Sequence, residues 1–544
     1  MKTTKKLLAL VLALAMVVTA FAACSGGTES STSSAANESS ASDSSTADES
    51  GSEESSAAED DGTIHPMRIV QPGTLCSDYD TGIAAVNEKL QADGVNIEVS
   101  MIRIPWDAYA EKLNLMLTTG EEFELLHVMQ DVKNLSAIAA MDAIISIHDL
   151  IGNYPDLYNK FSETEWLGTL YNGEEYAVPC YWRSFDNVMS YMNYRTDVAE
   201  AVGYDEFPET TEEIIDLMQK SQDYILEETG MKAYNWFHQN QDTAHWLHRS
   251  YDTYPFYVEN SLGIVLIRQD GTVDSFYESE EFKQDANTYY EMYQAGLIDP
   301  DILNRDSQKK YDDAMYGAML PSQTFSPDQG VTMQDNGVEG AEVEWVAAFG
   351  DDIPDMIYTY VQNLNAISAT SEDPESGLKF LNWLYASEEN HNLYHYGIEG
   401  THYTVTGDHR IEQVKGEDGN AIYDMTTWMT GYLPYMCYAS NSTDNNIDYM
   451  TYKSDNYVIS PAAGFIFDAS NVQSELTNLQ TEIIASIYPI KVGMVSYEEN
   501  IDAAIEKLKA AGLDAYLEEY RTQFQAYLDA NPDVLEIAKG TTEG

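Results

Sequence analysis

The sequence predicts an α/β protein with two lobes, and three observations lead to that prediction. The chain has 544 residues, more than the roughly 250 to 300 that one hydrophobic core usually supports. From residue 67 onward, strand patterns alternate with helix patterns, and repeated β-α-β order indicates a parallel sheet covered by helices. The alternation continues on both sides of residues 181–194. We therefore expect one lobe on each side of that stretch.

The first lobe begins with clear strand and helix patterns. Apolar residues at alternate positions predict a half-buried strand, whereas apolar residues three and four positions apart predict a helix. Asp80 stands where the first helix would have its N-cap. On these criteria we expect strands over 67–70, 96–104 and 125–128, and helices over 81–91 and 106–117.

The later part of the chain shows the same two patterns. Thr210 and Glu213 form a capping box, which marks a helix start. Residues 262–267 predict a strand that enters a turn at Asp270 and Gly271. Further helices are expected over 282–293, 378–384, 498–510 and 516–528.

The first 24 residues have the pattern of a targeting segment. Three lysines precede an apolar run over residues 7–20, and a small-residue site closed by Cys24 follows. This site resembles the bacterial lipoprotein signal box, in which the cysteine becomes the lipidated N-terminus, although Phe21 stands where that box usually has Leu. We expect removal of residues 1–23 and a lipid anchor on the extracellular face of the cell membrane. Ordinary secretion with cleavage near Ala23 is the alternative.

Residues 24–61 predict a disordered linker. After the cysteine, 14 of these residues are Ser and 10 are acidic, and none is aromatic or basic. Such a segment cannot bury enough apolar surface to offset the entropy lost on ordering. The scaling of a flexible chain places its ends roughly 35 Å apart. The linker would therefore hold a folded body clear of the membrane.

The charge and the cysteines exclude several classes of function. The 28 Lys and Arg stand against 91 Asp and Glu, for a formal net charge of −63. Nucleic-acid binding depends on cationic groups that displace counterions, so we expect no nucleic-acid partner. Besides Cys24, the chain has Cys76, Cys180 and Cys437, without the spacing of a disulfide framework or a metal site. Small buried thiols, with at most one bridge, are expected.

Seven segments, in order along the chain, resemble the extracellular solute-binding lipoproteins of carbohydrate-type ABC importers, the family 1 solute-binding proteins. Residues 171–179 resemble the family's DGKxYGVP segment, and residues 295–301 resemble KEGLIDPD. The last two segments are similar to an extra C-terminal domain of one subgroup, whose role is unassigned. The segments are 171–179, 192–197, 207–213, 295–301, 396–403, 464–468 and 507–513.

The resemblance implies a two-lobe fold of the type II periplasmic-binding-protein class. A hinge of two or three crossing strands would join the lobes, and ligand would bind in the cleft between them. Hinge closure around ligand in periplasmic binding proteins is a standard example of domain motion. We expect lobe 1 to hold residues 62–183 and 320–370, lobe 2 to hold 184–319 and 371–455, and a mostly helical C-terminal extension to hold 456–544.

The expected ligand, a neutral oligosaccharide, sets the residue types to look for. A sugar presents apolar CH faces and a rim of hydroxyl groups, so its site needs aromatic platforms and polar clamps. Trp182 is the candidate platform and Arg183 the candidate clamp, because both follow the strand end where the family's chain enters the cleft. The alternative is that Trp182 packs under the hinge. Asp78 follows the first strand, where ligands of open α/β sheets lie.

Four more residues are candidates for ligand binding, and two of them have a structural alternative. Trp106 either faces the cleft or holds the start of its helix. Glu399 is either a ligand carboxylate or an anchor for its own loop. Trp236 is favoured over Trp246, because the latter also fits a helix core. Trp428 is the last of the four.

Two spacings suggest metals, but neither matches a known site fully. His391, His395 and Glu399 have the spacing of a zinc site on a helix, but Asn392 stands where a metalloprotease needs Glu. Residues 444–455 place oxygen ligands as a calcium loop does, but a tyrosine takes the position of its glycine. We therefore expect no metal and no cofactor.

The sequence favours a receptor over an enzyme. It lacks a nucleophile elbow, a phosphate-binding loop and an HExxH motif. We interpret the chain as a monomeric, membrane-anchored protein that captures a neutral oligosaccharide and delivers it to the permease subunits of an ABC transporter. The alternatives are a binding protein for a peptide or another polar solute, a secreted polysaccharide-cleaving lipoprotein, and a structural surface lipoprotein without a small ligand.

Overall fold

A computed structural model describes most of the chain from residue 62 onward. The signal segment, Cys24 and the linker over 24–61 lie outside the described residues. Within the described residues, no helix combines the length and the apolar character needed to cross a bilayer. The described ranges are 62–130, 132–183, 191–235, 245–259, 262–303, 307–322, 326–350, 352–417 and 419–540.

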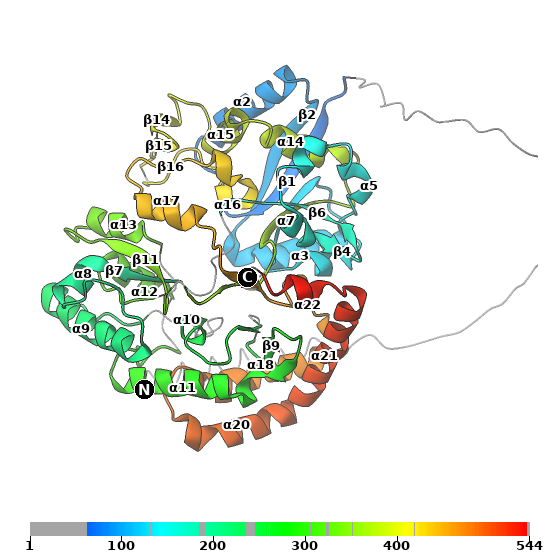
Figure 1. Cartoon of the computed structure of the whole chain (residues 1–544). Coiled ribbons are helices and arrows are strands. Elements are labelled where there is room, and N and C mark those ends of the chain that lie inside the picture. Colours follow the sequence, from blue (N-terminus) through cyan, green and yellow to red (C-terminus); the bar gives the residue numbers. More distant parts are fainter. Residues whose placement is uncertain are drawn as a thin grey trace, which may run out of the picture. The chain divides into compact units, whose positions relative to one another are not determined.

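The first lobe is built on a five-stranded sheet (Figure 1). Its strands are β1 (His65–Pro72), β2 (Ile97–Ile104), β3 (Leu125–Met129), β6 (Ala177–Pro179) and β13 (Asn363–Ile367). Their order is β2-β1-β3-β13-β6. The first three strands run parallel, and β13 runs antiparallel to both of its neighbours. Expected strands 67–70, 96–104 and 125–128 are thus present in this sheet.

Helices cover both faces of this sheet because its strands are apolar on both sides. On one face Met67 and Val99 pack with Leu381 and Tyr394, and on the other face Val70 and Leu126 pack with Leu113. The N-cap position of the first of these helices holds Asp78 and not Asp80. The covering helices are α2 (Tyr79–Ala92), α14 (Glu375–Leu384) and α15 (Glu388–Tyr396) on the first face and α3 (Tyr109–Thr119) on the second.

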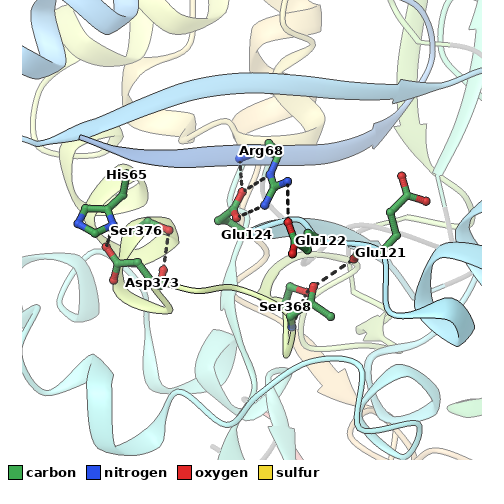
Figure 2. Close-up of polar contacts among 9 residues, drawn as sticks. His65, Arg68, Glu121, Glu122, Glu124, Ser368, Asp373 and Ser376 are labelled. Atoms are coloured by element: carbon green, nitrogen blue, oxygen red, sulfur yellow. Dashed lines mark hydrogen bonds and ion pairs between the residues drawn. The ribbon is translucent and has the colours of Figure 1, made fainter. Parts of the chain in front are cut away.

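An ion pair fastens the amino-terminal end of the sheet (Figure 2). Arg68 donates from Nε and Nη2 to the Glu124 carboxylate at 3.0 and 2.7 Å. Its backbone N–H donates to the same carboxylate at 2.6 Å. The Glu124 side chain is only 2% exposed, and a buried carboxylate is stable only when its partners are in place. The pair therefore holds β1 against the entry to β3.

Shorter elements complete the first lobe. β14 and β15 form a hairpin, and β15 pairs in parallel with β16. The short elements are η1 (Trp106–Ala108), α4 (Leu135–Ala139), α5 (His148–Ile151), α6 (Pro155–Tyr158), α7 (Glu163–Leu167), β4 (Leu170–Tyr171), β5 (Glu174–Glu175), β14 (Tyr403–Gly407), β15 (Arg410–Gln413), α16 (Thr427–Thr430), η3 (Leu433–Tyr435) and β16 (Tyr438–Ala439).

The second lobe holds two small antiparallel sheets and the helices around them (Figure 1). One sheet pairs β7 (Tyr191–Arg195) with β11 (Val343–Ala347), and the other is a meander of β8 (Phe256–Val258), β9 (Val265–Arg268) and β10 (Val273–Ser275). The helices are α8 (Thr196–Ala201), α9 (Thr211–Thr229), α10 (His245–His248), η2 (Phe276–Glu278), α11 (Glu280–Gln294), α12 (Ser307–Met315) and α13 (Gln329–Asp335).

The C-terminal helices share the hydrophobic core of the second lobe. Leu479, Leu508 and Phe524 belong to the same buried cluster as Leu266 and Phe282. The extension is mostly helical, as expected, but it has no separate core among the described residues. Its elements are η4 (Ala469–Val472), α18 (Gln473–Glu482), η5 (Ile483–Ile487), α19 (Tyr488–Lys491), α20 (Tyr497–Ala511), α21 (Leu513–Ala530) and α22 (Val534–Ile537).

The structure groups two segments differently from the expected division into lobes. Residues 371–439, expected in the second lobe, belong to the first, where Leu381 and Tyr394 are buried on its sheet. Residues 329–347, expected in the first lobe, belong to the second, where residues 343–347 pair with β7. Local periodicity shows which face of an element is apolar. It does not show which of two sheets that face covers.

The chain passes between the lobes three times, after β6, after β11 and in the region of α17 (Asp444–Thr451), where Asn445 Nδ2 donates to Val343 O of β11 at 3.5 Å. The second and third passages pair as parallel strands, β12 (Asp355–Ile357) with β17 (Tyr457–Ile459). Asp355 is buried and accepts hydrogen bonds from Tyr191 Oη at 2.8 Å and Arg249 Nη1 at 2.5 Å. These crossing strands correspond to the hinge that the family resemblance implies.

Candidate ligand-binding site

Two tryptophans from distant parts of the chain stack on one another beside the first sheet. Trp106 follows β2 in η1, and Trp428 lies in α16. Their ring centroids are 6.0 Å apart and their planes differ by 27°. The edge of the His127 ring contacts Trp428, with centroids 5.2 Å apart. Trp106 is 55% exposed, so the pair presents an aromatic face to solvent where β2 ends.

A row of polar side chains crosses the sheet next to this pair. Arg103 of β2 lies opposite Gln71 of β1, and His127 of β3 lies opposite Asn365 of β13. Because Val70 is the partner of Leu126, the next residues, Gln71 and His127, are also neighbours. Opposed residues on adjacent strands share one face of a sheet. The four side chains therefore form one polar row on an otherwise apolar face.

The segment that includes α16 covers this polar row. Asn365 Nδ2 donates to Met429 O at 3.2 Å. Arg103 Nη1 donates to Pro72 O at 2.9 Å, and the guanidinium also contacts the sulfur atoms of Met425 and Met429. Both amide atoms of Gln71 and Arg103 Nε are buried without a hydrogen-bond partner in the described part of the chain. Such groups are normally satisfied by ordered water or a ligand.

Burial also determines the charge of the polar row. Burial lowers the pKa of His127 to about 3. The imidazole is therefore uncharged at neutral pH, because its cationic form would be taken out of water without a counterion. Arg103 is then the one cation of the row, and amides and a neutral ring supply the remaining hydrogen-bonding groups.

The residue that leads into α16 is in an unusual backbone conformation. Thr426 has φ +59° and ψ +93°, and a positive φ is a genuine outlier for a β-branched residue. Its N–H donates to Asp424 Oδ1 at 2.6 Å, which holds the turn. Strained residues of this kind cluster at ligand-binding and active sites. Thr426 directly precedes the helix that carries Trp428.

Asp78 and Glu399 take part in one loop rather than in the tryptophan platform. The Asp78 carboxylate lies 3.1 Å from His402 Nε2 and accepts from Thr81 Oγ1 at 2.6 Å. These two hydrogen bonds lower its pKa. His402 Nδ1 accepts the Ile398 N–H at 2.9 Å, so the loop around the exposed Glu399 is tied to the start of α2. The Asp78 side chain thus has a structural partner.

Trp182 and Arg183 stack on one another. The Arg183 guanidinium carbon lies 4.9 Å from the centre of the Trp182 ring, and both residues are half-buried. Trp182 Nε1 and Arg183 Nε have no hydrogen-bond partner among the described residues. Trp236 lies outside the described residues. Trp246 is buried and donates to Tyr289 Oη at 3.3 Å, as expected for a helix core.

The two metal-like spacings fold into ordinary structure. His391 and His395 are buried and lie against the end of α16 and the residues after it. His391 Nε2 accepts the Tyr432 N–H at 3.1 Å, and His395 Nε2 lies 3.2 Å from the carbonyl oxygen of Thr430, the last residue of α16. Residues 444–451 form the helix α17 rather than a calcium loop. The three described cysteines are free thiols, with Cys180 buried and the other two half-buried.

Sequence reasoning missed two groups that the structure assembles. The first is the polar row, whose only signal was a polar side chain inside each apolar strand. The second is Trp345 of β11, which contacts Tyr191 and Tyr452 with ring centroids 4.9 and 5.0 Å apart. Trp345 was not among the candidates, because no pattern along the chain indicates that it would meet Tyr191 and Tyr452.

The chain matches a known protein family. Residues 77–391, more than half of the chain, match the family described as bacterial extracellular solute-binding protein. The chain belongs to this family. Residues 461–529 of this solute-binding protein match a domain of unknown function, DUF3502, which confirms the predicted C-terminal domain of unassigned role. Members of the family are binding proteins and not enzymes, in agreement with the expectation.

Relatives of the solute-binding protein align with most of its length. A carbohydrate ABC transporter substrate-binding protein of Streptococcus pneumoniae is 24% identical over 490 residues, 85% of this chain and 91% of its own. The N-glycan transport solute binding protein NgtS of the same species is 20% identical with a TM-score of 0.67, covering 86% of this chain and all of its own. NgtS in complex with Man5GlcNAc has a TM-score of 0.59 at 21% identity, covering 86% and 99%. The two-lobe fold is therefore confirmed.

Proposed function

We propose that this solute-binding protein captures a neutral oligosaccharide at the Trp106–Trp428 pair and delivers it to the permease subunits of an ABC transporter. The observation that carries the proposal is the stacked pair itself, with Trp106 55% exposed beside the polar row. Aromatic faces bind the CH surfaces of sugar rings, and amide and guanidinium groups bond hydroxyls. Arg103 is the half-buried member of the row, whereas Gln71, His127 and Asn365 are buried beneath it, so the guanidinium group is the polar partner proposed for the aromatic face.

Two further arguments favour a neutral sugar of several units. The net charge of −63 repels polyanions, and His127 is uncharged at neutral pH. The S. pneumoniae relative is a carbohydrate ABC transporter substrate-binding protein by name, and a structure of the relative NgtS holds Man5GlcNAc. An oligosaccharide is therefore a better candidate than a peptide, which remains the alternative ligand.

Closure about the hinge would bring the second lobe onto the bound sugar. Hinge closure is how two-lobe binding proteins enclose ligand, and the closed form is what a permease would distinguish. We propose Trp182, Arg183 and Trp345 as residues that face the sugar in the closed form. Asp78 and Glu399, in the loop tied to α2, and Trp236, outside the described residues, stay predictions from the sequence.

The proposed location of the protein is the extracellular face of the membrane. Lipidated Cys24 would anchor it, and the linker over 24–61 would give it reach. Firm attachment needs more than one acyl chain. Mass spectrometry of the mature N-terminus tests this part of the proposal: a lipid-modified Cys24 supports it, and an unmodified N-terminus near that position contradicts it.

Ligand binding is tested with Trp106→Ala. Neutral oligosaccharides should quench or enhance tryptophan fluorescence and raise the melting temperature of the unaltered protein, because a ligand of the folded state stabilises it. Loss of the aromatic platform should weaken binding at least about tenfold, or 1.4 kcal/mol. The matched control is Tyr316→Ala, which removes an aromatic side chain that is 53% exposed outside the platform.

Three results would contradict the proposal. Trp106→Ala could bind oligosaccharides as tightly as the control variant does. A panel of peptides could raise the melting temperature where glycans do not. Incubation with glycans could yield shorter products, which would make the protein an enzyme.

A further inference from the structure

Glu388, His409 and Cys437 come together at a place that the proposed function does not use. Glu388 begins α15, His409 lies in the turn between β14 and β15, and Cys437 directly precedes β16. One potential ligand atom of each residue lies within 4.8 Å of the corresponding atom of the others. A carboxylate, an imidazole and a thiol from three separate segments thus converge on one point.

The His409 ring makes a hydrogen bond of the kind that metal-binding histidines make. Its Nδ1 lies 3.0 Å from Met436 O. A carbonyl oxygen can only accept, so Nδ1 carries the proton and Nε2 keeps its lone pair. Metal-binding histidines typically have this second hydrogen bond, which fixes both the tautomer and the ring plane. Met436, the residue before Cys437, therefore fixes the tautomer in which His409 Nε2 can bind a metal.

Hydrogen bonds within the protein hold the backbone around the cluster. His409 has φ +48°, a conformation uncommon outside glycine, and its carbonyl accepts the Tyr438 N–H at 2.8 Å. The hydroxyl of Tyr396 bonds both the N–H and the carbonyl of Cys437, at 2.9 and 3.1 Å. Two of the three ligands thus sit on backbone that the surrounding structure fixes.

We propose that these three side chains bind a divalent cation of the zinc type. Zn²⁺ takes nitrogen, sulfur and oxygen ligands in a tetrahedron, and water would complete the fourth position. Ca²⁺ and Mg²⁺ prefer oxygen ligands alone and do not fit a thiol–imidazole pair. The thiol loses its proton to solvent as the metal–sulfur bond forms. The bound ion would join α15 to the hairpin and to β16.

The test is titration of the full-length mature protein with Cd²⁺, a zinc substitute whose bond to a thiolate gives an ultraviolet charge-transfer band. One equivalent should produce the band, and Zn²⁺ should abolish it by competition. Zn²⁺ should also raise the melting temperature. The band should be absent in Cys437→Ser, and Cd²⁺ affinity should fall at least about tenfold in His409→Gln.

The matched control is Cys76→Ser, which removes the other half-buried thiol and should leave the band unchanged. Circular dichroism checks that each variant is folded, and Glu388→Gln, at an exposed position, provides an independent weakening of affinity. A band that persists in Cys437→Ser, or a wild-type protein that binds no stoichiometric Cd²⁺, would refute the site. Oligosaccharide binding is measured separately, so its failure would not be confused with loss of the metal site.

Discussion

His391 shows how burial decides the chemistry of a side chain in this protein. Its ring is fully buried, with Nε2 bonded to the Tyr432 N–H and Nδ1 lying 3.2 Å from Asn392 Oδ1. Burial lowers its pKa to about 4, so the ring is neutral under physiological conditions. His391 therefore links α15 to the segment that follows α16. The helix α16 itself carries Trp428.

We predict that this histidine makes the protein less stable in mild acid. The unfolded chain takes up a proton below about pH 6.5 while folded His391 stays neutral, so the free energy of unfolding falls as the pH drops from about 6.5 to about 4. The slope is up to about 1.4 kcal/mol per pH unit for each such group. In His391→Gln, chemical denaturation at several pH values should show a shallower fall.

The control for this prediction is His148→Gln. His148 is exposed, and the Glu175 carboxylate beside it raises its pKa. Its contribution is present below about pH 6.5 and is lost as the pH rises through the raised value, so removing it should change the pH dependence in the opposite sense. Equal pH profiles for wild type and His391→Gln would contradict the prediction.

At the scale of an element, Gly493 is where α19 meets α11. Its φ is +75°, and a Cβ there would lie 2.1 Å from Tyr289 O. We predict that Gly493→Ala destabilises the protein by more than about 3 kcal/mol, because backbone must move to relieve the clash. Urea denaturation measures this change.

Gly94→Ala is the control for this prediction, because it measures the cost of the left-handed backbone conformation without a steric clash. Gly94 has φ +78°, and a Cβ there would meet nothing within 4 Å. This variant carries the cost of a left-handed alanine alone, about 1 to 2 kcal/mol. If the two variants lose the same free energy, the contact between α19 and α11 does not matter for stability.

Elements were the part of the fold that sequence patterns predicted well. The predicted helices over 81–91 and 498–510 are observed as Tyr79–Ala92 and Tyr497–Ala511, and the predicted strand over 96–104 as Ile97–Ile104. The acidic stretch from Asp444 was compared with a calcium loop, but it begins a helix. The Thr443 hydroxyl accepts the Asn446 N–H at 3.0 Å and caps that helix.

At the scale of the whole molecule, the C-terminal extension is part of the second lobe. Leu479, Leu508, Tyr516 and Phe524 are buried in the same cluster as the strands of that lobe. Burial of each large apolar side chain is worth about 1.5 to 3 kcal/mol. Their sum is comparable with the whole stability of a domain, about 5 to 15 kcal/mol.

We therefore predict that a chain ending at residue 460 does not fold its second lobe. Calorimetry should show loss of the cooperative transition of that lobe, together with aggregation. A chain that starts at residue 62 and keeps the extension is the control, and it should melt as the full-length protein does. A shortened chain that stays soluble and cooperative would mean that the extension is an independent module.

By itself the sequence determined the types and order of the elements, the family and the aromatic candidates Trp106 and Trp428, because periodicity, caps and motifs are local. Only the tertiary structure decided that α14 and α15 cover the first sheet. It also decided that Arg103, Gln71, His127 and Asn365 form one row. Those relations depend on which strands pair and in which register, and pairing joins residues up to several hundred positions apart. The Glu388, His409 and Cys437 cluster has the same origin, since no spacing along the chain predicts it.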